Sequence, residues 1–188
     1  MPGDNDVPSN KFQLTSYADL QRRETPLALR RLIELQHRPI LGNFDVAHLQ
    51  AIHRYLFQDV YNWAGEIRSV TISKPDATFP PPQYLKLSLE SLFGELAGEN
   101  FLKDLSAPAW ASRAAYYLGE INAIHPFREG NGRTQREFIR ELALAGGHSL
   151  VWTAQTPEEM IDASKRSFLG RDYSALEHII KTCLSIRS

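Results

Sequence analysis

Apolar residues recur at three- and four-residue steps along most of the chain, which is the spacing of one face of an α-helix. The clearest stripe follows Asp45, a residue that can cap a helix start; its apolar positions are Val46, Leu49, Ile52, Leu56, Phe57 and Val60. Similar stripes predict helices over 85–96, 109–124 and 133–145. The fold class expected from this pattern is all-α, a compact helical bundle.

Capping residues predict helices at both ends of the chain as well. Thr25 would cap a first helix with Pro26 in its first turn, and Pro39 would lie beyond its end. Thr156-Pro157-Glu158-Glu159 reads as a capping box that opens a helix running to about Leu169. A final helix is expected from about Ser174 to the C-terminus.

One segment departs from the helical pattern. Residues 69–73 alternate polar and apolar side chains, which is typical of a strand, and 74–77 resemble a turn. The return at Thr78-Phe79 ends in three prolines, which cannot donate to a strand ladder. We therefore predict a small hairpin that leans on the helices and leaves one edge open.

Composition narrows the class of protein. The chain has 188 residues, 43% hydrophobic and 23% charged, with a net charge of −1, so it lacks the basic excess of a polyanion binder. The lone cysteine, Cys183, is expected to fill the core. No signal peptide or membrane span is predicted, and we expect a cytoplasmic protein without direct nucleic-acid or membrane binding. Residues 1–12 are expected to be disordered and 13–188 to form one domain.

The stretch with the most chemistry is HPFREGNGRTQR, residues 125–136, between two predicted helices. Gly130 and Gly132 allow close approach of a ligand, and the following helix begins here with unpaired N–H groups and a positive dipole. Such a turn is a natural phosphate cradle. Arg133 and Arg136 share one helix face, where two guanidinium groups suit more than one phosphate.

The remaining groups of this stretch suggest transfer chemistry. Glu129 is its only acid, and a carboxylate beside phosphates favours an intervening Mg²⁺ ion. His125 is the only group there that exchanges a proton near neutral pH. Taken singly, each residue is more often structural; together within twelve residues they favour transfer of a phosphorus group from a nucleotide to a hydroxyl.

This stretch resembles the signature of the Fic family, H-x-F-x-[DE]-G-N-G-R-x-x-R, at every fixed position. The segments 56–61 and 63–66 and Arg68 also resemble the family's entry to its flap. The resemblance covers about residue 15 to the C-terminus and implies a Fic-type helical fold. It also implies a protein adenylyltransferase that moves AMP from ATP, with Mg²⁺, to a hydroxyl of a target protein and releases pyrophosphate.

The resemblance assigns roles to the residues of the signature. His125 would deprotonate the target hydroxyl, and Glu129 would hold Mg²⁺. Gly130, Asn131 and Gly132 would form the anion cradle, with Asn131 helping to fix the α-phosphate. Arg133 and Arg136 would hold the outer phosphates, and Phe127 would anchor the loop in the core.

The hairpin resembles the family's flap, where a target segment adds a strand to the open edge. Thr71, Ile72, Ser73 and Phe79 would dock the target, with Phe79 pinning the target residue. A purely structural hairpin is the alternative.

Many Fic proteins carry an inhibitory helix with the pattern [ST]-x-x-x-E-[GN]. Here Ser91 and Glu95 have the spacing, but Leu96 follows. The chain therefore resembles a toxin whose small antitoxin supplies a glutamate to Arg136, and the resemblance suggests the ATPase subunits of DNA gyrase and topoisomerase IV as targets. Two alternatives stay open: transfer of UMP or phosphocholine on the same fold, and a catalytically idle binding module.

Overall fold

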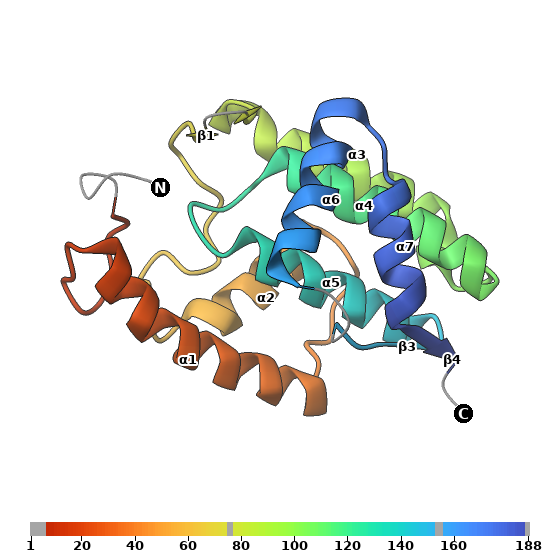
Figure 1. Cartoon of the computed structure of the whole chain (residues 1–188), viewed down its shortest axis with the longest axis horizontal. Helices are drawn as coiled ribbons and strands as arrows, with labels where there is room; N and C mark the ends of the chain where they lie inside the picture. The colour runs from red at the N-terminus through yellow and green to blue at the C-terminus, as the bar shows by residue number, and fades with distance from the viewer. Residues whose placement is uncertain (1–6, 75–76, 153–155, 187–188) are drawn as a thin grey trace.

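Helices make up most of the computed structural model, which describes residues 7–74, 77–152 and 156–186 (Figure 1). The helices are α1 (Tyr17–His37), α2 (Val46–Phe57), α3 (Pro82–Gly98), α4 (Ala107–Ile124), α5 (Asn131–Ala145), α6 (Pro157–Gly170) and α7 (Ser174–Cys183), with a 3-10 turn at Asn100–Leu102. Two antiparallel pairs of short strands complete the fold: β1 (Ser73–Lys74) with β2 (Ala77–Thr78), and β3 (His148–Leu150) with β4 (Leu184–Ile186). The predicted all-α class is confirmed.

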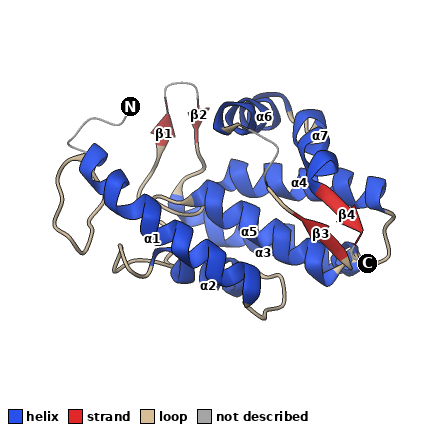
Figure 2. Ribbon diagram, turned by 60° about the horizontal axis from the view of Figure 1, so that its bottom comes forward, coloured by secondary structure: helices blue, strands red, loops and turns tan. Residues whose placement is uncertain are grey.

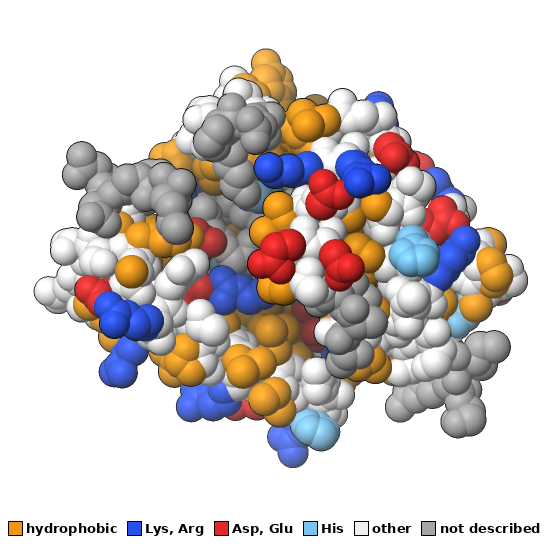
Figure 3. Space-filling view, in the orientation of Figure 1, with side chains coloured by type: hydrophobic (Ala, Val, Ile, Leu, Met, Phe, Trp, Pro, Cys, Tyr) orange, Lys and Arg blue, Asp and Glu red, His pale blue; other side chains and the backbone are white. Residues whose placement is uncertain are grey.

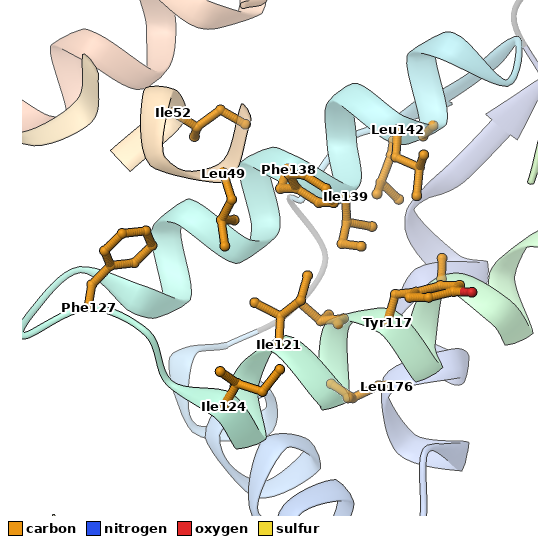
Figure 4. Close-up of a cluster of buried hydrophobic side chains, with 14 of the residues drawn as sticks. Leu49, Ile52, Tyr117, Ile121, Ile124, Phe127, Phe138, Ile139, Leu142 and Leu176 are labelled. Carbon is orange, nitrogen blue, oxygen red and sulfur yellow. The ribbon is translucent and has the colours of Figure 1, made fainter. Parts of the chain in front are cut away.

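The core lies between the two helices that flank the glycine-rich stretch. α4 packs against α3, α5, α6 and α7, while α5 also packs against α2. Figure 4 shows side chains of these helices meeting in one cluster, among them Leu49, Ile52, Ile121, Ile124, Phe138, Ile139 and Leu142. This packing sets the end of α4 beside the start of α5, where the candidate chemistry lies.

The first helix begins earlier than predicted. Ser16, rather than Thr25, caps α1, its side chain accepting from the backbone N–H of Asp19 (3.4 Å). Pro26 therefore lies inside the helix, where a proline normally costs a hydrogen bond. Burial offsets that cost, because the packed face of α1 starts at Leu20, five residues before the predicted cap.

The predicted hairpin is present but short. Ser73 pairs with Thr78, and Lys74 pairs with Ala77; the predicted turn residues Pro75 and Asp76 lie outside the described residues. One more cross-strand bond follows the ladder, from the Phe79 N–H to the Ile72 carbonyl (3.2 Å). Beyond it, the carbonyls of Val70 and Pro80 accept from the Arg68 guanidinium (both 2.8 Å), and the prolines after Phe79 have no N–H to continue the ladder.

The second strand pair was not predicted. α7 ends at Cys183 instead of continuing, and β4 pairs with β3 so that His148 faces Ile186. Figure 2 shows β1–β2 beside α6 and β3–β4 near the C-terminus. Strands of three residues are too short to give a period-2 pattern, so sequence periodicity misses them. Cys183 is buried in the core, as expected.

The N-terminal segment is described from Val7 onward. In contrast to the disorder expected over 1–12, residues 7–12 contact the helical body: the backbone N–H of Lys11 donates to Val60 (2.8 Å), and the Trp63 indole donates to the Ser9 carbonyl (2.8 Å). Residues 1–6 lie outside the described part. None of the described helices combines the length and apolar character that crossing a membrane requires.

Candidate active site

The path of the loop from His125 to Gly130 is set by the left-handed backbone of His125 and by the buried side chain of Phe127. α4 ends at His125, whose left-handed conformation (φ 49°) turns the chain away from the helix axis. Phe127 is 1% exposed and stacks on His53 with ring centroids 3.9 Å apart, so it anchors the loop as expected. His53 also bonds the Glu129 carbonyl through Nε2 (3.0 Å), and burial lowers the pKa of His53 to about 4, which keeps it neutral.

Asn131 closes the same loop. Its buried side chain accepts from the Phe127 N–H (2.9 Å) and donates to the Phe127 carbonyl (2.7 Å). The amide expected to help fix the α-phosphate is therefore engaged in holding the loop. If Asn131 contacts a phosphate, its backbone N–H is the group available to do so.

The start of α5 has the geometry of an anion cradle. Gly130 lies at φ 76°, and a Cβ there would sit 2.4 Å from the Phe57 ring. The first intrahelical bond runs from the Thr134 N–H to the Gly130 carbonyl (3.2 Å), so the amides of residues 131–133 precede it. These amides point along the helix axis toward the loop, where an anion would be stabilised.

The two arginines of the motif lie in different environments. Arg133 pairs with Glu24 of α1 and lies over the Phe57 ring, 4.7 Å from its centroid. Arg136 has no carboxylate partner among the residues that the structure describes, and burial, then the charge of Arg133, lowers its pKa. Two neighbouring guanidinium groups, one of them without a carboxylate in this part of the chain, form a site that an anion would stabilise.

Glu129 faces this site from the other side. One carboxylate oxygen accepts from the Tyr17 hydroxyl (3.1 Å) and the other from the Gly130 N–H (3.1 Å). Burial, then the charge of Glu129, raises the pKa of Tyr17 to about 12. A cavity of about 240 Å³ connects these groups; its lining includes Tyr17, Glu24, Tyr61, Glu129, Arg133 and Arg136. Figure 3 shows a hollow on this face with acidic and basic side chains in it.

The residues present fit a Mg²⁺ ion that is bound mainly through a nucleotide. Within the described ranges no group of three or more acidic, histidine or cysteine side chains converges on one point. Glu129 is a single carboxylate beside an anion cradle, and Mg²⁺ is commonly held by one or two carboxylates with phosphate oxygens and water. Glu129 would be the protein ligand.

His125 lies between the cradle and the hairpin. It is 9% exposed, and its Nδ1 lies 3.3 Å from the Asn122 carbonyl, which can only accept. In the tautomer whose Nδ1 donates to this carbonyl, Nε2 is the nitrogen that can accept a proton. Phe79 stacks on the imidazole, with centroids 4.0 Å apart.

The predicted docking residues of the hairpin divide into two groups. Thr71 and Ser73 are exposed and Ile72 is half-buried, whereas Phe79 is buried against His125. The structure thus brings Glu129, Arg133 and Arg136 to one cavity and stacks Phe79 on His125 at the start of the same loop, while Thr71 and Ser73 are exposed on the hairpin.

Sequence analysis did not single out Tyr17 or Glu24, and it named Tyr61 and Arg68 only within the resemblance to the family's flap entry. Glu24 accepts from both Tyr61 and Arg133 and is 4% exposed. A signal for it exists, because Glu24 lies four residues after Leu20 and four before Ala28, within the buried stripe of α1. An acid in an apolar stripe needs a buried partner.

Comparisons with known proteins find relatives of this chain in sequence and in structure. The model of the Fic/DOC family matches residues 43–143. The chain is 42% identical to protein adenylyltransferase VbhT of Bartonella schoenbuchensis over 161 residues, covering 86% of this chain but 34% of VbhT. It is 31% identical to the "Probable protein adenylyltransferase Fic" of Escherichia coli, covering 96% of this chain and 88% of that protein. The crystal structure of BepC from Bartonella tribocorum with bound AMPPNP superposes with a TM-score of 0.88 at 26% identity, covering 97% and 94% of the two chains.

Proposed function

Because this chain belongs to the Fic/DOC family, we propose that it transfers AMP from ATP to a hydroxyl group of another protein and releases pyrophosphate. Five curated relatives, 31–45% identical to it, carry protein adenylyltransferase in their names, three of them as "Probable protein adenylyltransferase". The observation that carries the proposal is that Glu129, Arg133 and Arg136 line one cavity at the start of α5, while His125 begins the loop that leads to it. The complete set argues against an idle binding module.

In the proposed reaction, the start of α5 and both arginines hold the phosphates of ATP. His125 Nε2 accepts the proton of the target hydroxyl as the hydroxyl oxygen attacks the α-phosphorus. The bond from that phosphorus to the bridging oxygen breaks, and pyrophosphate leaves with the electron pair. Mg²⁺ held by Glu129 would neutralise phosphate charge when bound. The cradle stabilises the charge that develops on the phosphoryl oxygens.

The target would dock on the hairpin. Exposed Thr71 and Ser73 lie beside the stacked pair of Phe79 and His125, so a strand added at this edge would pass close to the base. Main-chain hydrogen bonds of an added strand would present a target hydroxyl without requiring a particular sequence around it.

We further propose that the protein acts in the cytoplasm as the toxin of a toxin–antitoxin pair, on the ATPase subunits of DNA gyrase or topoisomerase IV. The antitoxin would direct a glutamate to Arg136. A groove of about 690 Å³ between α1, α5 and the β3 segment supports this, because it is lined by Leu29, Ile33, Val151 and Arg136. Three of these are apolar and about half exposed (54%, 48% and 50%), and the guanidinium lacks a carboxylate partner in the described part of the chain.

The test is transfer of label from α-labelled ATP, with Mg²⁺, to purified gyrase and topoisomerase IV ATPase subunits and to a bacterial lysate. We expect a labelled protein band that is absent with γ-labelled ATP. His125→Ala should lower the rate by about 10²–10⁴-fold, the usual contribution of a general base, while retaining ATP affinity. Label from the γ-position would indicate phosphoryl transfer instead, and label from UTP alone would indicate another donor. Full activity of His125→Ala would exclude the base assignment.

A further inference from the structure

Arg68 is a buried cation that is surrounded by main-chain carbonyl groups. It is 4% exposed, and its guanidinium donates to the carbonyls of His125, Val70 and Pro80 (each 2.8 Å) and of Ile124 (3.4 Å). Its own backbone N–H donates to the Pro126 carbonyl (2.9 Å). No carboxylate among the described residues pairs with it.

Burying this charge is costly, because only dipoles compensate for the lost water. The same desolvation lowers the pKa of Arg68. An apolar side chain would avoid the cost of the charge but would leave these carbonyls without a donor, so the value of the guanidinium lies in the set of hydrogen bonds that it makes. Its planar fork presents donors in fixed directions, which a lysine ammonium does not.

The four carbonyls belong to two separate parts of the site. Val70 lies before β1 and Pro80 lies after β2, so the fork holds both legs of the hairpin. Nε donates to the main-chain carbonyl of His125, a residue whose backbone lies in the strained left-handed region (φ 49°). Phe79, next to Pro80, stacks on the imidazole of the same His125.

We propose that Arg68 is a positioning residue that couples the target-docking hairpin to the catalytic His125, through simultaneous hydrogen bonds to both hairpin legs and to the His125 carbonyl. The inference rests on the proposed function, because the hairpin matters only if a target docks there. The hydrogen bonds of the Arg68 guanidinium go to the hairpin legs and to the end of α4, and not to Glu129, Arg133 or Arg136, so nucleotide binding does not depend on it.

The experiment compares Arg68→Met and Arg68→Lys with the wild type and with Arg113→Met. Arg113→Met is the control because this substitution also removes an arginine with several partners, Glu95 and Glu99. Arg113 lies on the α3 side of α4, away from the site. We expect both Arg68 variants to bind ATP within about twofold of wild type by calorimetry. We expect kcat/KM for the protein target to fall at least tenfold in Arg68→Met, which corresponds to about 1.4 kcal/mol. Arg68→Lys should recover only part of this loss.

Hydrogen exchange provides a readout that does not need activity. In Arg68→Lys, which retains the charge and most of the stem, amides in 68–74, 77–81 and 124–127 should exchange faster than in wild type, while those of α5 stay unchanged. Arg113→Met should leave the hairpin amides unchanged. Faster exchange throughout the protein, or none at the hairpin, would overturn the proposal, as would loss of ATP affinity equal to the loss of transfer. If the wild type transfers no AMP, the proposed function fails, and the exchange pattern still decides the coupling.

Discussion

Gly130 illustrates how a missing side chain shapes the anion site. Its positive φ turns the loop into α5, and the Phe57 ring occupies the space where a Cβ would lie. The same ring supports Arg133 from below, 4.7 Å from the guanidinium carbon. The Phe57 ring thus sets both the backbone path of the candidate cradle and the position of Arg133, for which we propose phosphate binding.

Gly130→Ala should therefore be damaging, because the new Cβ meets Phe57 at 2.4 Å and the backbone angle is strained. We expect the free energy of unfolding to fall by about 2–4 kcal/mol and transfer activity to be lost. Urea denaturation and the labelling assay measure these effects.

Gly94→Ala is the matched control. Gly94 lies inside α3, and no neighbouring atom comes within 4 Å of the place where a Cβ would be added. Alanine should therefore stabilise the protein by about 0.5–1 kcal/mol at unchanged activity. Similar losses in both variants would contradict the steric explanation.

At the scale of elements, residues of α1 line one side of the candidate active-site cavity, although α1 lies outside the region that the family model matches. It brings Tyr17 to Glu129 and Glu24 to Arg133. Its position on α2 depends in part on Asp59, which accepts from Arg31 at 2.8 and 2.9 Å and from Arg30 at 3.1 Å. A shift of α1 relative to α2 would therefore displace both Tyr17 and Glu24 from the cavity.

Asp59→Asn tests this attachment through pH. The Arg31 hydrogen bonds, above all, hold the pKa of Asp59 below its ordinary value. A lowered carboxyl pKa contributes stability that is complete above about pH 4, near the unfolded value, and disappears as pH falls through the folded pKa. We expect Asp59→Asn to lose about 1 kcal/mol at about pH 7 and progressively less below about pH 4. Urea denaturation in both pH ranges checks this, and a pH-independent difference would contradict it.

At the scale of the whole molecule, the site is assembled from three segments that are distant in sequence: α1, the hairpin and the loop before α5. Figure 1 shows α5 running through the middle of the molecule, between α1 and the C-terminal helices. The far end of α5 leads into β3, which β4 covers. The start of α5 thus carries the candidate chemistry, while its C-terminal end, next to the β3–β4 pair, contributes to stability.

A variant truncated after Cys183 should lose stability without losing ATP binding. Removing β4 leaves β3 unpaired, and we expect the melting temperature to fall by about 3–6 °C, corresponding to a loss of about 1–2 kcal/mol. Calorimetric ATP binding should stay within about twofold of wild type, because the cradle lies at the other end of α5. Loss of ATP binding at a temperature where the shortened chain is folded would show that the two ends are coupled.

Contiguous residues determine the cradle and its base, and these could be predicted from sequence. A helix start, its capping glycine and the arginine one turn later depend on local backbone geometry, which residue order specifies. Helices α2 to α5 could be predicted because their apolar periodicity is longer than one turn, and α6 because its capping box is local.

Tertiary packing alone decided the rest. Arg68 meets His125 across 57 residues, and Arg133 meets Glu24 across 109. Such pairs depend on how helices dock, and a single polar residue in a stripe does not reveal its partner. The early start of α1 and the brief strands have the same origin: long-range burial and pairing outweighed the local signals of Thr25 and of α7. The sequence by itself thus determined which groups are candidates for the reaction, and only the tertiary structure decided what holds them in place.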